Sequence, residues 1–563
     1  MVLSNNLLRK ESVKFWLFFA VLSFLSLLMI IIYFPPGELR FGHDCYFHLQ
    51  RLEALMEALK NGTFPVYLDY DAINGYGYAT KWFYPDPVFI PFALIGNVTN
   101  LTFAYKSLLF VMSILCGTFT YMAVKSIYKS SFSATISALL YTFCIYRLLD
   151  LFERAAIGEV LAFTFIPLIM WGLHEIVTGN YKKWYILAIG YSLLIFSHLL
   201  SSVLTFIVII LLLLFYIKTL IKEPTRVLYL FVAALVTVTL TVYYWLPMLE
   251  QMQSNDFYYE MHDNAGFNKD FGFSLRMLGR SLLSGILPAA SMFSVGIGIL
   301  LTLSVCLAFF VHFKIKKLRS VDVGVIIGIF LVIMCTSVFP WWIWPFNKLS
   351  FIQAPWRFFI FVSYFFAIAG GCYLAYIVKT SKNRYIVTTL IVLITVFIFL
   401  NEGNSYKKKT PIITPTSIAP GLKFNYHMGG LEYIPAKVPS LNFIEQRGKA
   451  IISENNTTKV SNIGINYGMI DFGVTLSEPD KLELPLFYYK GYSATDGKNN
   501  INVSQGNNGL VELQVNNSGH VKVFYKGTFI QKFSFYFSIL SVLLFCIFIG
   551  YKRRKDKDME QYA

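Results

Sequence analysis

The chain has 563 residues, of which 56% are hydrophobic and 14% are charged, and its formal net charge is +16. Soluble domains carry about 25% charged residues. This composition therefore excludes an ordinary water-soluble protein and indicates an integral membrane protein. The basic residues lie in short tracts beside hydrophobic segments, without a basic stripe interleaved with aromatic residues, which argues against a nucleic-acid partner.

Hydrophobic runs long enough to cross a membrane recur along the whole chain. We expect about twelve transmembrane helices, because each run is near the length that crosses ~30 Å of hydrocarbon. Basic tracts fall on alternate turns, which places both termini in the cytoplasm. The predicted spans are residues 15–34, 101–124, 131–149, 159–178, 184–199, 200–218, 226–245, 292–313, 322–339, 357–378, 385–401 and 531–550.

The predicted fold class is an all-α polytopic membrane protein with a small β-rich extracytoplasmic domain near the C-terminus. Residues 1–401 form the membrane domain, which has a large first outer loop at 35–100. Residues 402–530 contain short alternating stretches separated by turn signals such as Asp496-Gly497, which predicts antiparallel strands after a linker at 403–440. The final helix and a basic cytoplasmic tail occupy 531–563.

Helical periodicity begins soon after the first predicted span. Residues 45–60 place their leucines on one stripe, which is typical of a helix lying along a membrane surface. Asp44, His48 and Arg51 recur at i, i+4 and i+7 and share another face. Asp44 follows His43 at the N-cap, where a carboxylate is favourable with or without a function. These residues are therefore either a functional constellation or a cap beside two surface side chains.

The next turns are rich in acidic, aromatic and glycine residues. Asp69 and Asp71 precede the run Gly75-Tyr76-Gly77-Tyr78. One hypothesis is a sugar-binding lip at the membrane face. The alternative is an irregular loop that is rich in turn residues.

Ionisable residues gather between the third and fourth predicted spans. Asp150, Glu153 and Arg154 lie within about one helical turn, and Glu159 occupies the first turn of the next helix. Such residues are costly at membrane depth and are functional candidates. The alternative is a mutually neutralising ion cluster that caps a short loop.

A third candidate region starts the tenth predicted span. Pro355 is suited to begin the helix, and Arg357 then opposes the helix dipole in the first turn. Another group is expected to hold this guanidinium, and a lipid-linked phosphate suits it because the pairing is bidentate. The alternative is that Trp356 and Arg357 are interfacial anchors. Glu250 is a further outer-face candidate, whereas His198 is interpreted as a core histidine.

Several of these motifs resemble known families. The Asp44, His48 and Arg51 pattern after the first span resembles the first outer loop of GT-C fold glycosyltransferases. The stretches YPDPVF, RAAIGEVLAF and IQAPWRFF resemble bacterial membrane proteins labelled "6-pyruvoyl-tetrahydropterin synthase-related". The stretch LPLFYYKGYSATDGK resembles the outer domain of the YfhO-like family.

The GT-C resemblance implies a polyprenyl-phosphate-sugar-dependent glycosyltransferase of the bacterial plasma membrane. Such an enzyme moves the sugar to a cell-surface polymer or glycolipid on the outer face. Asp44 matches the catalytic carboxylate, and Arg154 and Arg357 would hold the donor phosphate. A divalent cation, Mg²⁺ or Mn²⁺, is left open as a cofactor. Asp150, Glu153 and Glu159 would be the second acidic group for acceptor or metal, and His43, His48, Arg51, Asp69, Asp71 and Glu250 would support them.

Two departures and two rival functions accompany this interpretation. Asp44 follows a histidine rather than a second acid, and the chain has no Trp-Trp-Asp motif, which argues against peptide asparagine as the acceptor. A transporter or flippase of lipid-linked sugars predicts acidic residues within spans and broken helices in paired positions. A non-catalytic cell-envelope scaffold would tolerate loss of the charged candidates.

Overall fold

The computed structural model describes residues 2–261, 272–284, 295–311, 318–413, 432–455 and 457–562. Parts of the predicted span 292–313 and of the predicted linker 403–440 lie outside these ranges. The chain divides into two compact units. The first comprises Met1–His48, Val98–Thr237 and Asp263–Ser417, and the second comprises Leu49–Asn97, Val238–His262 and Ile418–Ala563.

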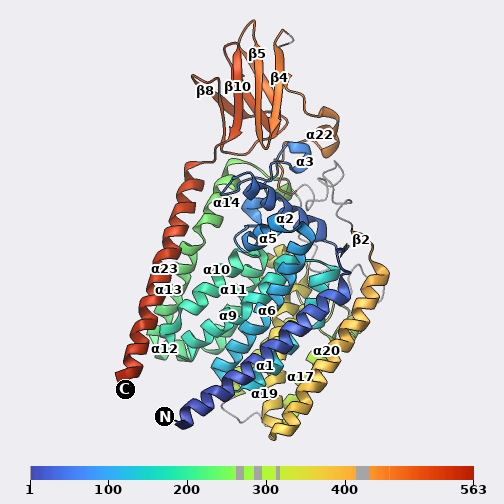
Figure 1. Ribbon diagram of the computed structural model, residues 1–563, viewed down its shortest axis with the longest axis vertical. Helices are drawn as coiled ribbons and strands as arrows, with labels where there is room; N and C mark the ends of the chain where they lie inside the picture. Colours follow the sequence, from blue (N-terminus) through green and yellow to red (C-terminus); the bar gives the residue numbers. More distant parts are fainter. Residues whose placement is uncertain are drawn as a thin grey trace. The chain divides into compact units, whose positions relative to one another are not determined.

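The first compact unit is helical. Helices α1 and α20 lie side by side in Figure 1, and α6 packs against α1, α7 and α9. A two-stranded sheet pairs β1 with β2. The elements are α1 (Val2–Tyr33), β1 (Leu39–Arg40), α6 (Leu101–Tyr128), α7 (Ser131–Thr142), α8 (Ile145–Leu148), η1 (Leu149–Glu153), α9 (Ile157–Val177), η2 (Tyr181–Lys183), α10 (Tyr185–Ile195), α11 (Leu199–Phe215), α12 (Ile217–Lys222), most of α13 (Pro224–Leu240), α16 (Leu275–Leu283), α17 (Gly298–Cys306), η4 (Leu307–Phe310), α18 (Arg319–Met334), η6 (Phe346–Ile352), η7 (Pro355–Phe358), α19 (Phe359–Ile377), α20 (Ser381–Lys409) and β2 (Ile412–Ile413).

Small residues and polar caps explain how these helices form and pack. Asn100 and Ser130 accept bonds from backbone N–H groups three residues later and so cap α6 and α7. A Cβ atom on Gly371 would lie 2.2 Å from Ser137 Oγ, so only glycine permits this approach of α19 to α7. Close contact through small residues is the usual way in which helices associate in lipid.

Fewer helices are long and apolar enough to cross a membrane than the twelve spans predicted. Among the described residues, six helices are long and apolar enough to cross a membrane, or up to eight if each of two bent pairs is one span. The remaining predicted spans form the shorter α10, α11, α17 and α18. The chain is therefore a helical membrane protein, and twelve spans stay a prediction. The six are Glu11–Tyr33, Leu101–Tyr128, Ile157–Val177, Pro355–Ile377, Ser381–Lys409 and Phe529–Lys555.

The second compact unit combines helices with the predicted β domain. Helix α14 packs against α23, and Figure 1 shows the strands in orange and red. Helix α2 begins in the first unit and continues in this one. The elements are α2 (Cys45–Lys60), α3 (Ala72–Gly75), α4 (Thr80–Phe83), α5 (Ile90–Val98), α14 (Val242–Ser254), η3 (Tyr258–Met261), α22 (Leu441–Arg447), β3 (Ile452–Ser453), β4 (Lys459–Asn466), β5 (Met469–Thr475), β6 (Asp480–Phe487), β7 (Tyr492–Thr495), β8 (Asn500–Gln505), β9 (Leu510–Val515), β10 (Gly519–Tyr525) and α23 (Phe529–Tyr562).

The eight strands form one antiparallel sheet in the order β3-β6-β9-β8-β7-β10-β5-β4. Alternate residues of β5 are buried, as the period of two requires for a strand with one covered face. Leu482 pairs with Leu513 across β6 and β9, which places both side chains on the buried face. The predicted β domain is therefore confirmed. Helix α20 runs on to Lys409, so the first residues of the predicted 402–530 segment are helical.

Candidate functional site

The backbone around Asp44 is fixed by the segment that follows the third predicted span. The His43 N–H donates to Glu153 O at 3.1 Å, and the Asp44 N–H donates to Arg154 O at 2.8 Å. Gly42 makes this approach possible, because a Cβ atom there would lie 2.5 Å from Phe152 O and 2.6 Å from Ala155 Cβ. Two segments that are distant in sequence are thus held together immediately before helix α2.

Asp44 is accessible but poorly solvated. Its side chain keeps solvent-exposed surface, as does that of His43. Partial burial nevertheless raises the pKa of the Asp44 carboxyl, and the positive charges of Arg154 and Arg357 oppose part of that rise. Burial also lowers the pKa of His43. Asp44 is therefore within electrostatic range of both candidate phosphate-binding arginines, as the sequence hypothesis requires.

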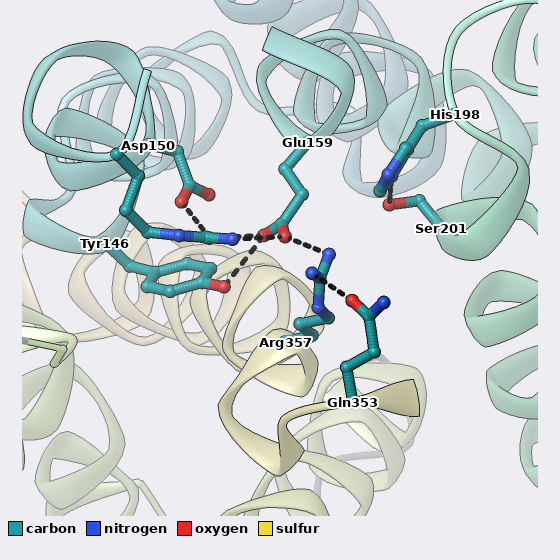
Figure 2. Close-up of polar contacts among 8 residues, drawn as sticks. Tyr146, Asp150, Glu159, His198, Ser201, Gln353 and Arg357 are labelled. Carbon is teal, nitrogen blue, oxygen red and sulfur yellow. Dashed lines mark hydrogen bonds and ion pairs between the residues drawn. The ribbon is translucent and has the colours of Figure 1, made fainter. Parts of the chain in front are cut away.

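A buried ion cluster lies around Glu159, at the start of α9 (Figure 2). The Arg154 guanidinium donates to Glu159 through Nη1 at 3.0 Å and through Nη2 at 2.9 Å, and to Asp150 Oδ1 at 2.5 Å. The Tyr146 hydroxyl donates to Glu159 Oε2 at 2.9 Å. The helix dipole favours a carboxylate at this position. Asp150 and Glu159 are 0% and 2% exposed. The sequence analysis assigned both carboxylates to an acceptor or a metal, but in the structure both are buried.

Arg357 joins this cluster from the short helix η7. Its Nη1 donates to Glu159 Oε1 at 2.6 Å, and its Nη2 donates to Gln353 Oε1 at 2.8 Å. We expected a lipid-linked phosphate to balance the charge of Arg357. In the structure, Glu159 balances it. The Arg357 side chain is 17% exposed, and its Nε has no hydrogen-bond partner within the described part of the chain. Because this Nε is itself buried, it would reach an anion only after the side chain moves.

Backbone irregularities surround the cluster. Residues Leu149–Glu153 form a π-helix, a local distortion that is frequent at functional sites. Ala155 and Gln353 have φ angles of 52° and 68°, which is costly for residues with a Cβ atom. No sequence pattern predicts these distortions, because they depend on packing between distant segments. Gln353 and Tyr146 were missed as members of the cluster for the same reason.

The predicted core histidine, His198, also lies near the cluster. A Cβ atom on Gly158 would lie 2.7 Å from His198 Cδ2, so the glycine leaves room for the imidazole beside the start of α9. His198 Nδ1 is 2.8 Å from Ser201 Oγ, and Figure 2 shows both side chains across from Glu159 and Arg357. His198 is therefore partly buried at the edge of the cluster.

Two predicted residues of the second unit, Arg51 and Asp69, belong to a buried network of their own. Lys81 Nζ lies 3.0 Å from Asp69 Oδ1 and 3.0 Å from Asp86 Oδ2. Arg51 Nη2 is 3.9 Å from Asp86 and donates to Tyr84 O at 3.2 Å. Burial raises the pKa of Asp69 to about 6, and Lys81 opposes that rise. The sequence suggested Arg51 and Asp69 as supporting site residues, but the network gives them a structural role in this unit.

The remaining supporting candidates have different settings. His48 is 3% exposed in the first unit and packs edge-on against Phe47. Asp71 is exposed in the second unit. Glu250, also in the second unit, accepts from Thr528 Oγ1 at 2.5 Å and lies 3.4 Å from Lys490 Nζ, which ties α14 to residues beside the sheet.

The predicted sugar-binding lip is not an exposed aromatic surface. Tyr76 and Tyr78 are both 0% exposed, and the Tyr76 hydroxyl donates to Gly448 O within the second unit. Gly75 and Gly77 have φ angles of 81° and 84°, which permit the tight turn. The alternative interpretation, an irregular loop rich in turn residues, therefore describes this segment.

The acidic residues of the cluster do not fit a divalent cation. Hard cations require several oxygen ligands, but both Glu159 oxygens and Asp150 Oδ1 already accept bonds from arginine. Within the described ranges, no group of three or more His, Cys, Asp or Glu side chains could hold a metal ion. Mg²⁺ or Mn²⁺ stays a prediction, and no chemical step below passes through one.

Comparison with known proteins adds one distant relative. No family model matches the chain. The sequence is 25% identical over 266 residues to an uncharacterized protein of Lactococcus lactis subsp. cremoris (strain MG1363). The match covers 46% of this chain and 43% of that protein, so the chain spans less than half of the relative's length. A match of this identity and extent assigns neither a family nor an activity.

Proposed function

We propose that this protein is a glycosyltransferase that moves a sugar from a polyprenyl-phosphate donor to a cell-surface polymer or glycolipid. In this proposal about twelve helices cross a bacterial plasma membrane, both termini are cytoplasmic, and Asp44 faces the outer side. The observation that carries the proposal is geometric: the backbone N–H of the accessible Asp44 donates to Arg154 O at 2.8 Å, and Arg154 and Arg357 both bond to Glu159 in the same compact unit.

The chemistry assigned to Asp44 is general base catalysis. Its carboxylate accepts the proton of an acceptor hydroxyl, and the hydroxyl oxygen attacks the anomeric carbon of the donor sugar. The bond between that carbon and the phosphate oxygen breaks, and polyprenyl phosphate leaves with the electron pair. A raised pKa makes the ionised Asp44 carboxylate a stronger base.

The role assigned to the arginines is to hold the donor phosphate and to stabilise the charge that develops on it. Arg357 is the better placed, because its side chain is 17% exposed. Arg154 is 7% exposed and fully engaged with Glu159 and Asp150. Its contribution is therefore to orient Glu159, which in turn fixes Arg357, and to supply positive potential.

The test is transfer by the purified full chain in nanodiscs, with polyprenyl-phosphate sugars as donors and isolated cell-wall polymer as acceptor. Asp44→Asn keeps the shape of the side chain but removes the base, and general bases contribute about 10²–10⁴-fold to rate. We expect a loss in that range with an unchanged unfolding temperature. Unaltered transfer by a well-folded Asp44→Asn protein would refute the catalytic assignment.

One observation favours a second function, transport of lipid-linked sugars. Two helix pairs are broken, Ser131–Thr142 with Ile145–Glu153, which are bent by 43°, and Pro224–Leu240 with Val242–Ser254. Discontinuous helices that carry buried charges are a feature of transporters. Movement of a fluorescent polyprenyl-phosphate sugar across sealed vesicles, without formation of a glycosidic bond, would select this alternative.

A further inference from the structure

A cavity adjoins the segment that holds Asp44. Its volume is about 60 Å³, it is partly open to solvent, and it lies within the first compact unit. One wall is apolar and comes from α8 and η1, and the opposite wall is the polar end of α20. Its lining residues are Tyr33, Ile145, Leu148, Leu149, Phe152, Glu153, Glu402, Ser405, Tyr406, Lys409 and Thr410.

A buried hydroxyl without a partner points to a ligand in this cavity. Tyr33 is 2% exposed, and no described residue forms a hydrogen bond with its hydroxyl oxygen. Its ring is fixed, because it stacks on Phe152 with centroids 3.9 Å apart and lies 5.6 Å from Tyr406. A buried phenol ordinarily finds a hydrogen-bond partner. The Tyr33 hydroxyl is therefore positioned to bond with a molecule that enters the cavity.

The charges in the cavity select against an anion. Glu153 and Glu402 interact electrostatically, and Lys409 is the one cation among the lining residues. Carboxylates accept hydrogen bonds from hydroxyl groups but repel phosphate. Aromatic and aliphatic side chains on the other wall match the apolar face of a sugar ring. A neutral carbohydrate satisfies all three features together.

The cavity and the Asp44 region share one wall. The π-helix directs Asp150 into the Glu159 cluster, whereas Glu153 lines the cavity. The backbone oxygen of Glu153 also accepts the His43 N–H beside Asp44. Of the three acidic residues predicted to bind an acceptor, Glu153 is therefore the one whose side chain reaches open space.

We propose that this cavity, between α1, η1 and α20, binds a neutral sugar ring of the acceptor. Glu153 and Glu402 accept bonds from its hydroxyl groups, and the Tyr33 hydroxyl completes the set. The assignment to the acceptor rests on the proposed glycosyltransferase function, because Asp44 needs an acceptor hydroxyl next to it. The assignment to carbohydrate rests on the cavity alone.

The test is saturation-transfer NMR on the purified full chain in nanodiscs. The probes are methyl α-D-glucopyranoside, methyl β-D-galactopyranoside and methyl N-acetyl-β-D-glucosaminide. We expect the protein to bind at least one probe. Loss of a hydrogen bond to a charged group weakens binding about tenfold, so Glu153→Gln and Glu402→Gln should each raise the dissociation constant by about that factor. Tyr33→Phe, which keeps the stacked ring, should weaken binding about fivefold.

Two controls separate this proposal from the catalytic one. Glu38→Gln removes a carboxylate that lies beyond α1 and does not line the cavity, and it should leave binding unchanged. Asp44→Asn should lower transfer by the expected factor of about 10²–10⁴ but keep the binding. If the wild-type protein binds none of the three probes, or if the Glu153, Glu402 and Tyr33 variants bind as well as wild type, the cavity assignment is wrong whether or not transfer occurs. Binding that depends on these residues, in a protein without transferase activity, would leave the cavity assignment intact and remove the proposed function.

Discussion

Glu159→Gln should destabilise the protein more than any other single loss of charge in the cluster. Glu159 accepts four hydrogen bonds, two from Arg154, one from Arg357 and one from Tyr146. Glutamine retains the shape but turns an NH₂ group towards a guanidinium and leaves two buried cations under-compensated. Removal of one partner from a buried ion pair costs about 3–5 kcal/mol. We expect the free energy of unfolding to fall by that amount.

The assay is unfolding of the purified protein in nanodiscs, followed by intrinsic fluorescence. Glu223→Gln is the matched control, because Glu223 pairs with Arg226 at 2.9 Å but its side chain is 53% exposed. An exposed pair contributes about 0–1 kcal/mol. Replacing Arg357 with methionine in the Glu159→Gln background should recover part of the loss, because it removes an unpaired buried charge. Equal stability of Glu159→Gln and Glu223→Gln would refute the view that Glu159 neutralises both arginines.

Three further predictions concern the elements around the cluster and the second unit. Gly42→Ala inserts a methyl group against Phe152 O and Ala155 Cβ. A displacement of Asp44 by about 1 Å should lower transfer about 10²-fold while the fold survives. Normal transfer by this variant would show that the backbone approach does not position Asp44. The transfer rate should fall as the pH is lowered through the raised pKa of Asp44, because only the ionised carboxylate accepts a proton, and a rate unaffected by acid down to about pH 4 would exclude this base. The pKa of folded Asp69 is about 6, above the ordinary value of 3.8. Its contribution to stability is therefore present below about pH 4 and is lost as the pH rises through about 6. Asp69→Asn should flatten this pH dependence of the unfolding temperature, and an unchanged profile would contradict the assignment.

Local patterns predicted local structure well. The apolar stripe of residues 45–60 predicted helix α2, Cys45–Lys60, and the alternating stretches within 402–530 predicted strands such as β9, Leu510–Val515. Both depend on the periodicity of neighbouring side chains, which the sequence shows directly. The gathering of Asp150, Arg154 and Glu159 also follows from short separations. An ion cluster was one of the two interpretations of these residues, and it is present.

Long-range pairing could not be read from the same patterns. The sequence placed Arg51 on one face with Asp44 and His48, but α2 buries Arg51 against residues of the second unit. Lys81 carried no signal, although it pairs with both Asp69 and Asp86. The counter-ion of Arg357 lies 198 residues away in the chain. Such pairings depend on tertiary contacts, and a single sequence does not encode them in its periodicity.

A structure of the full chain with undecaprenyl phosphate bound would show directly whether Arg357 and Asp44 form one donor site. We expect the phosphate to accept hydrogen bonds from the Arg357 guanidinium, with the Asp44 carboxylate facing the same space. A phosphate bound elsewhere, with Arg357 still closed on Glu159 and Gln353, would contradict the assignment of these arginines to the donor.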